Sequence, residues 1–246
     1  MSKIKLNLAA AMILTLGMLL GLNSPARADS IDLLTITGYN LTSGVNVTVN
    51  GANLGTKYGA EFYGTIDLAG NNNFQDVVGY CVDLYQTVGS GTYSDYYLAS
   101  VGGSASTQAE AWLLGHYAPG LGNAYSGSLT TTITALQLAI WEVTYDYSAG
   151  GSYSLSAGNF YTSGLDSGIS SLATSYLQAM VASDVTQTGL GFSGVLRSES
   201  HQDLIVGATS GATPEPASML LFGSAAGLMG WLRRRQSKRQ AEVKIA

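Results

Sequence analysis

Two side chains in this sequence could react with one another: the thiol of Cys81 and the carboxamide of Gln137. Cys81 is the only cysteine, so it cannot form an internal disulfide. The segment around Gln137 predicts a helix that places its carboxamide on one face with Ile133, Ile140 and Trp141. Burying an unpaired carboxamide there costs a few kcal/mol. Attack of the Cys81 thiolate on the Gln137 carbonyl, with loss of ammonia, would instead give an internal thioester.

The two segments resemble the thioester domains of bacterial surface adhesins, which pair an aromatic-Cys-apolar-polar strand motif with a later T-Q-x-A-x-W helix motif. Tyr80 to Asp83 fits the first motif, and Gln137, Ala139 and Trp141 fit the second, with Leu136 in place of the threonine. The resemblance implies a thioester cross-link between Cys81 and Gln137 that couples covalently to an amine on a partner. Such a bond reacts once without turnover, so we expect no enzyme. The residues expected to support its pocket are Tyr80, Asp83, Trp112, Ala139, Trp141 and Glu142.

Other interpretations of Cys81 remain open at this point. A cysteine hydrolase would pair it with His116 or His201, but no segment near it resembles a nucleophile turn. One cysteine and two distant histidines give no metal-ligand spacing, and we expect neither a metal nor a cofactor. A thioester could also serve only as a structural cross-link, as a disulfide does. The main alternative is a non-covalent matrix-binding or carbohydrate-binding surface protein with an unreactive, buried Cys81.

The N-terminus predicts a secretory signal peptide over residues 1–28. Lys3 and Lys5 precede a fifteen-residue apolar run, and the small residues Ala26 and Ala28 mark a cleavage site for signal peptidase. We therefore expect the mature chain to begin at Asp29.

The C-terminus combines Pro214-Glu215-Pro216, an apolar stretch over 217–232, and the basic residues Arg233, Arg234 and Arg235. As a helix the stretch would reach only ~24 Å of a ~30 Å hydrocarbon core, with Trp231 and the arginines at the interface. The order resembles the PEP-CTERM sorting signal of exopolysaccharide-producing Gram-negative bacteria, recognised by the membrane protease exosortase. This implies residues 211–239 as a sorting signal with a basic tail at 233–239. It also implies transient anchoring in the inner membrane, then placement on the cell surface or in a biofilm matrix.

The charges between the two signals are mostly negative. Residues 29–213 carry fourteen acidic side chains against only Lys57 and Arg197, a formal charge of −12. This balance argues against a nucleic-acid partner, which requires clustered cations. It suits a partner that presents amines.

The length between the two signals, with no internal repeat and no proline-rich linker, predicts a single domain over 29–210. Strands are expected at 45–49, 62–68, 77–85, 189–196 and 203–206, with a turn at Asn50-Gly51. Helices are expected from Thr107, as a capping residue with Glu110, and over 131–143 and 167–181. The predicted class is α+β, a β-rich barrel-like or sandwich-like frame with a helical insert.

Overall fold

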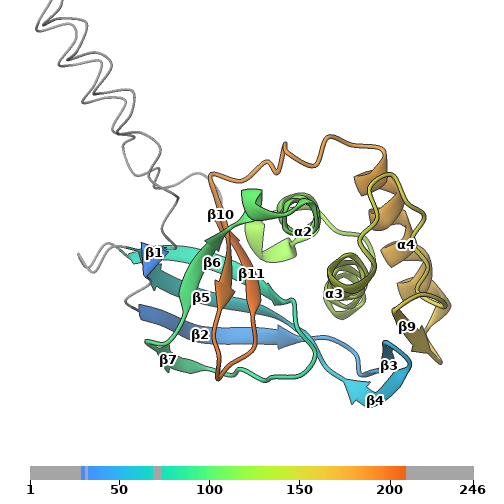
Figure 1. Ribbon diagram of the computed structural model, residues 1–246, viewed down its shortest axis with the longest axis horizontal. Helices are drawn as coiled ribbons and strands as arrows, with labels where there is room; N and C mark the ends of the chain where they lie inside the picture. The colour runs from blue at the N-terminus through green and yellow to red at the C-terminus, as the bar shows by residue number, and fades with distance from the viewer. Residues whose placement is uncertain (1–28, 31–32, 69–73, 209–246) are drawn as a thin grey trace, which may run out of the picture.

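The computed structural model describes residues 29–30, 33–68 and 74–208, and it confirms the α+β class (Figure 1). The described helices are α2 (Ala105–Tyr117), α3 (Leu129–Asp146) and α4 (Ser167–Val181). The described strands are β1 (Asp29–Ser30), β2 (Leu33–Leu41), β3 (Val45–Val49), β4 (Ala52–Lys57), β5 (Ala60–Asp67), β6 (Phe74–Cys81), β7 (Gly91–Tyr93), β8 (Tyr97–Ser100), β9 (Phe160–Ser163), β10 (Phe192–Arg197) and β11 (Leu204–Ala208).

The larger sheet has the strand order β1-β8-β10-β11-β6-β5-β2-β7, and its strand pairs are antiparallel. Strand β6 lies inside this sheet, bonded to β11 on one side and to β5 on the other. The strand ends at Cys81, earlier than the predicted end at residue 85. The chain turns there because the carboxylate of Asp83 accepts the backbone N–H groups of Tyr85 and Gln86, each at 2.9 Å. Cys81 therefore stands at the end of an interior strand.

The smaller sheet has the order β4-β3-β9 and begins with the hairpin expected from its sequence. Asn50 and Gly51 connect β3 to β4 with φ values of 50° and 78°. Both residues tolerate the left-handed conformation that a tight hairpin turn requires. The residues just after β4 lead directly into β5, so the hairpin connects the smaller sheet to the larger one.

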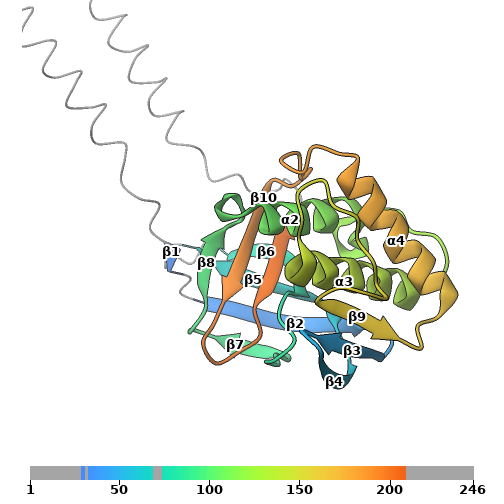
Figure 2. The same ribbon diagram turned by 45° about the vertical axis from the view of Figure 1, so that its right-hand side comes forward.

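The helical insert follows β8 and lies to one side of the larger sheet (Figure 2). Helix α3 packs against both α2 and α4, and every residue from Thr132 to Val143 is buried. A helix buried on all sides is a core element rather than an amphipathic surface helix. Any polar side chain in its middle must therefore find a partner inside the protein.

The helix boundaries agree with expectation in part. Helix α4 occupies the predicted residues 167–181, with Asp166 as its N-cap. The prediction of Thr107 as the first cap was wrong, because the Ser104 hydroxyl accepts the Thr107 N–H at 3.2 Å and α2 begins at Ala105. The predicted signal peptide and the predicted membrane helix at 217–232 lie outside the described residues. Among the described residues, no helix is both long and apolar enough to cross a bilayer.

Candidate functional site

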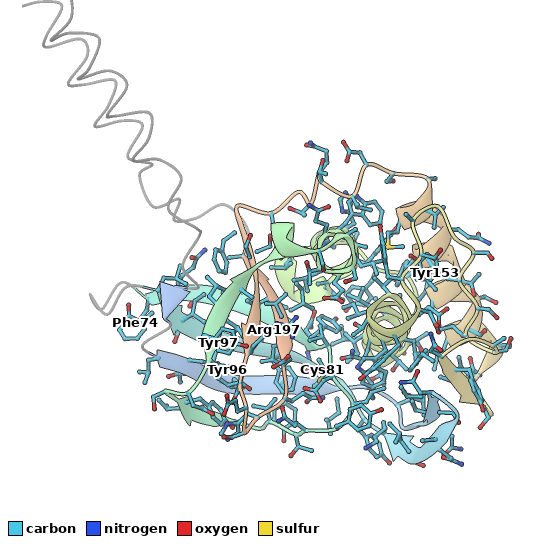
Figure 3. The ribbon with its side chains drawn as sticks, in the orientation of Figure 1. Phe74, Cys81, Tyr96, Tyr97, Tyr153 and Arg197 are labelled. Carbon is cyan, nitrogen blue, oxygen red and sulfur yellow. The ribbon has the colours of Figure 1, made fainter. Side chains whose placement is uncertain are left out.

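The carboxamide of Gln137 is hydrogen-bonded to the backbone of Cys81 at two points. Its Oε1 accepts the Cys81 N–H at 3.2 Å, and its Nε2 donates to the Cys81 carbonyl at 2.7 Å. Both residues are 1% exposed. Fold topology alone makes this contact possible, because β6 and the middle of α3 are separated by 56 positions in the sequence. The structure therefore brings together the two residues that the sequence singles out. Figure 3 labels Cys81 among the side chains of the domain.

The sulfur itself faces a second glutamine. The Cys81 Sγ donates to Oε1 of Gln202 at 3.1 Å, and Nε2 of Gln202 donates to the Asp83 carbonyl at 2.8 Å. Burial raises the pKa of the Cys81 thiol to about 12, and the negative charge of Asp83 also raises it. The thiol is therefore protonated at neutral pH, and Oε1 of Gln202 accepts its hydrogen bond. Sequence reasoning missed Gln202, which lies 121 positions from Cys81 and carries no motif.

A glycine leaves the space that the Gln137 side chain fills. A Cβ placed on Gly59 would lie 2.6 Å from Oε1 and 2.7 Å from Cδ of Gln137. The Gly59 N–H is held by the Thr42 hydroxyl at 2.8 Å, so the backbone has little freedom to withdraw. The loop between β4 and β5 thus packs directly against the Gln137 side chain that contacts Cys81.

We expect the substitution Gly59→Ala to displace this carboxamide. The overlap should lower the free energy of unfolding by about 1–3 kcal/mol and break the contact with the Cys81 backbone. Urea denaturation measures the first effect. Gly103→Ala is the control, because a Cβ there meets no heavy atom within 4 Å. Equal stability of the two variants would contradict the prediction.

A cavity of about 380 Å³ opens next to the sulfur. Cys81 and Trp141 form part of its wall, and the Nε1 of Trp141 is buried without a hydrogen-bond partner. The remaining wall is largely aromatic and aliphatic and carries no acidic side chain. Its lining residues include Tyr39, Leu41, Lys57, Tyr58, Phe62, Leu84, Val88 and Gln202. The cavity gives a small molecule or a side chain space next to Cys81, which is itself 1% exposed.

The residues expected to support the pocket divide into two groups. Asp83 shapes the turn after Cys81 and accepts the Asp203 N–H at 2.6 Å, while Ala139 is fully buried in α3. Glu142, one residue after the cavity-lining Trp141, uses Oε1 to accept the Ser154 N–H at 2.8 Å. Of these three residues, Asp83 is the one whose contacts lie directly after Cys81.

Tyr80 and Trp112 do not line the cavity. Tyr80 precedes Cys81 on β6, and successive strand residues point to opposite faces of a sheet. Its hydroxyl donates to buried Glu61 at 3.1 Å. Trp112 on α2 stacks on His116 with ring centroids 4.0 Å apart. The aromatic wall next to the sulfur is instead formed by Tyr39, Tyr58, Phe62 and Trp141.

Both histidines are engaged away from Cys81. His116 Nδ1 lies 2.8 Å from the Trp112 carbonyl, and His201 Nδ1 lies 2.9 Å from Asp95. The Cys81 thiol bonds Gln202 instead. Within the described ranges, no group of three or more His, Cys, Asp or Glu side chains could hold a metal ion. The structure thus brings Cys81 to a glutamine and to neither imidazole.

Two carboxyl groups are buried in the helical layer. Burial raises the pKa of Glu110 and the pKa of Glu142 from 4.5 to about 7. The Thr144 hydroxyl donates to Oε1 of Glu110 at 3.1 Å, which lowers the pKa of Glu110, but the effect of burial is larger. The neutral form of Glu110 therefore fits its site.

We expect stability to fall as pH rises because the pKa of Glu110 is higher in the folded than in the unfolded chain. Its contribution is complete below pH 4.5 and is lost as the pH passes 7. Glu110→Gln should match the wild type near pH 4 and exceed it by roughly 3 kcal/mol at pH 8. Chemical denaturation across this range tests the prediction. Exposed Glu199→Gln should leave the pH profile unchanged, and a wild-type profile in Glu110→Gln would contradict the prediction.

Comparison with known proteins identifies the C-terminal segment. A model of the PEP-CTERM protein-sorting motif matches residues 212–236. No curated protein and no solved structure shows significant similarity to the chain. The match confirms the sorting signal predicted around Pro214 to Arg235 and implies processing by the membrane protease exosortase. The chain therefore carries the signal of an exported protein that is sorted through the membrane toward the cell surface of a Gram-negative bacterium.

Proposed function

We propose that this exosortase-sorted surface protein forms an internal thioester between Cys81 and Gln137 and uses it to couple covalently to amines on a partner. The observation that carries the proposal is the two-point contact between the Gln137 carboxamide and the Cys81 backbone. The contact fixes the acyl carbon of Gln137 close to the residue that bears the thiol. It is buried, and a thioester persists only where water is excluded.

The proposed reaction has two steps. First, the Cys81 sulfur attacks the Gln137 carbonyl carbon, the carbon–nitrogen bond breaks, and the amide nitrogen leaves as ammonia with the thiol proton. Second, an amine attacks the thioester carbonyl, the carbon–sulfur bond breaks, and the proton of the amine returns to the sulfur. The products are a permanent amide at Gln137 and a free Cys81 thiol.

Proximity lowers the activation barrier of the first step. A protonated thiol is a weak nucleophile, and the pKa of Cys81 is about 12. Holding the two groups in contact makes the attack intramolecular, which can lower a barrier by about 7–11 kcal/mol. The two hydrogen bonds to the Cys81 backbone hold the Gln137 side chain in place for this purpose.

The acidic surroundings favour amine partners over longer distances. Residues 29–213 have a formal charge of −12, which attracts ammonium groups toward the domain. The sorting signal directs the protein to the envelope, so the proposed partner is an amine-bearing component of the cell surface or of the extracellular matrix. In this proposal the protein anchors itself and does not turn over a substrate.

Mass spectrometry of the freshly purified, exported protein tests the proposal. The wild-type chain should be one ammonia lighter than its processed sequence and should take up one methylamine at Gln137. Cys81→Ala should have its full sequence mass and take up none. A full-mass wild type with a titratable thiol would refute the thioester and favour non-covalent binding. The cavity of about 610 Å³ next to Tyr63, Phe74 and Asp76 is the surface such a binding protein would offer.

A further inference from the structure

One residue that lines the cavity next to Cys81 carries an amine. Lys57, the last residue of β4, is part of the cavity wall, and it is the only lysine in the described residues. Its ammonium group has no hydrogen bond or ion pair with any described residue. An amine in this position is free to move without breaking an existing interaction.

Lys57 is close in the chain to the residue that packs against Gln137, whose side chain would carry the acyl group. Lys57 lies two residues before Gly59, whose backbone packs against the Gln137 side chain. Lys57 is partly exposed and lines the same cavity as Cys81. Four rotatable bonds in its side chain allow the amine to turn inward.

Trp141, which also lines the cavity, has an unused hydrogen-bond donor. The Trp141 indole N–H is buried and has no partner among the described residues. Attack of an amine on a thioester develops negative charge on the carbonyl oxygen, and an unoccupied N–H donor stabilises such an oxygen. Gln137 and Trp141 lie one helical turn apart on α3, so this donor is on the same face as the acyl group.

Electrostatics at the cavity favour the resident amine over an incoming one. The wall has no aspartate or glutamate to neutralise a second ammonium, and Lys57 already places one positive charge there. An amine held at the cavity also competes at a high effective concentration. An external partner must therefore react before Lys57 does.

We propose that the Cys81–Gln137 thioester, where no partner amine intervenes, transfers its acyl group to Lys57 and forms an isopeptide bond between Lys57 and Gln137. The proposal rests on the thioester function proposed above. The carbon–sulfur bond breaks, a carbon–nitrogen bond forms, and a proton of the neutral Lys57 amine passes to the Cys81 sulfur. The product permanently links β4 to α3. It limits the period during which the exported protein can couple to a partner.

A time course with the exported protein tests this transfer. In the wild type, the fraction that takes up methylamine should fall with time at constant mass, while one titratable thiol appears. Protease digestion of the aged protein should give a peptide that joins Lys57 to Gln137. Lys57→Arg keeps the positive charge and removes the nucleophile. Its reactive fraction should fall only by hydrolysis, with gain of one water.

The other outcomes overturn the inference in distinguishable ways. A wild type that keeps its methylamine reactivity, or that loses it with gain of one water as Lys57→Arg does, excludes transfer to Lys57 and leaves the thioester intact as a function. Full sequence mass for both fresh proteins excludes the thioester itself and the transfer with it.

Discussion

Replacement of Gln137 by glutamate is expected to abolish both the loss of ammonia and the uptake of methylamine. The substitution keeps the length and shape of the side chain, but a carboxylic acid does not acylate a thiol without activation. The variant also loses the Nε2 donor that bonds the Cys81 carbonyl at 2.7 Å. A carboxylate placed against that carbonyl oxygen would be repelled, so the variant should become less stable as the pH rises. Intact mass and urea denaturation at two pH values measure both effects.

Gln202 provides the control for this experiment, because it also contacts Cys81. Gln202→Ala removes the acceptor of the thiol hydrogen and leaves the acyl donor in place. It should still lose one ammonia. If Gln202→Ala retained its full mass while Gln137→Glu lost ammonia, the assignment of the acyl donor would be reversed.

Removal of the Glu61 side chain should have the largest effect on stability. Glu61 is fully buried in β5, and its carboxylate accepts the Tyr80 hydroxyl at 3.1 Å, the Gly120 N–H at 2.8 Å and the Tyr63 hydroxyl. Hydrogen bonding to Glu61 is one reason why the pKa of Tyr80 is well above 10, after burial and the charge of the same carboxylate. Glu61→Ala leaves three donors without an acceptor and should lower the free energy of unfolding by about 3–5 kcal/mol.

Urea denaturation at neutral pH measures this loss. Glu199→Ala is the matched control, because that side chain is exposed and only its backbone carbonyl accepts a hydrogen bond. Its effect should stay within about 0.5 kcal/mol. A loss below about 1 kcal/mol in Glu61→Ala would mean that water replaces the carboxylate.

The elements that the sequence predicted well are those with a strong local pattern. Alternating valines and the Asn50-Gly51 turn predict β3 and its hairpin, and helix α4 has its capping residue directly before an apolar helical face. Strand β2 was missed. Its pairing with β5 shifts register between Ile36 and Gly38, and the apolar residues change sides there: Leu34 and Ile36 are buried, whereas Tyr39 and Leu41 are exposed. The sequence therefore shows no single alternation of apolar and polar residues through β2.

The contacts of the site also divide into those that a local sequence pattern predicts and those that only the fold creates. Helical spacing and the position of Cys81 predict that Gln137 needs a partner, and the structure supplies the Cys81 backbone. The roles of Glu61 and Gln202 depend on residues that only the fold brings together, such as Gly120 for the first and Asp83 for the second. No local pattern marks either residue, because neither lies in a motif or in a regular hydrophobic repeat.

The position of β11 determines how the domain would resist mechanical load. The sorting signal follows this strand, and Leu204–Ala208 is bonded to β10 along one edge and to β6 along the other. A pull on the C-terminus, opposed by the proposed amide at Gln137, would act along a strand that is hydrogen-bonded on both sides. Both ladders would have to shear together rather than open one bond at a time. We expect a domain attached in this way to unfold only at high force.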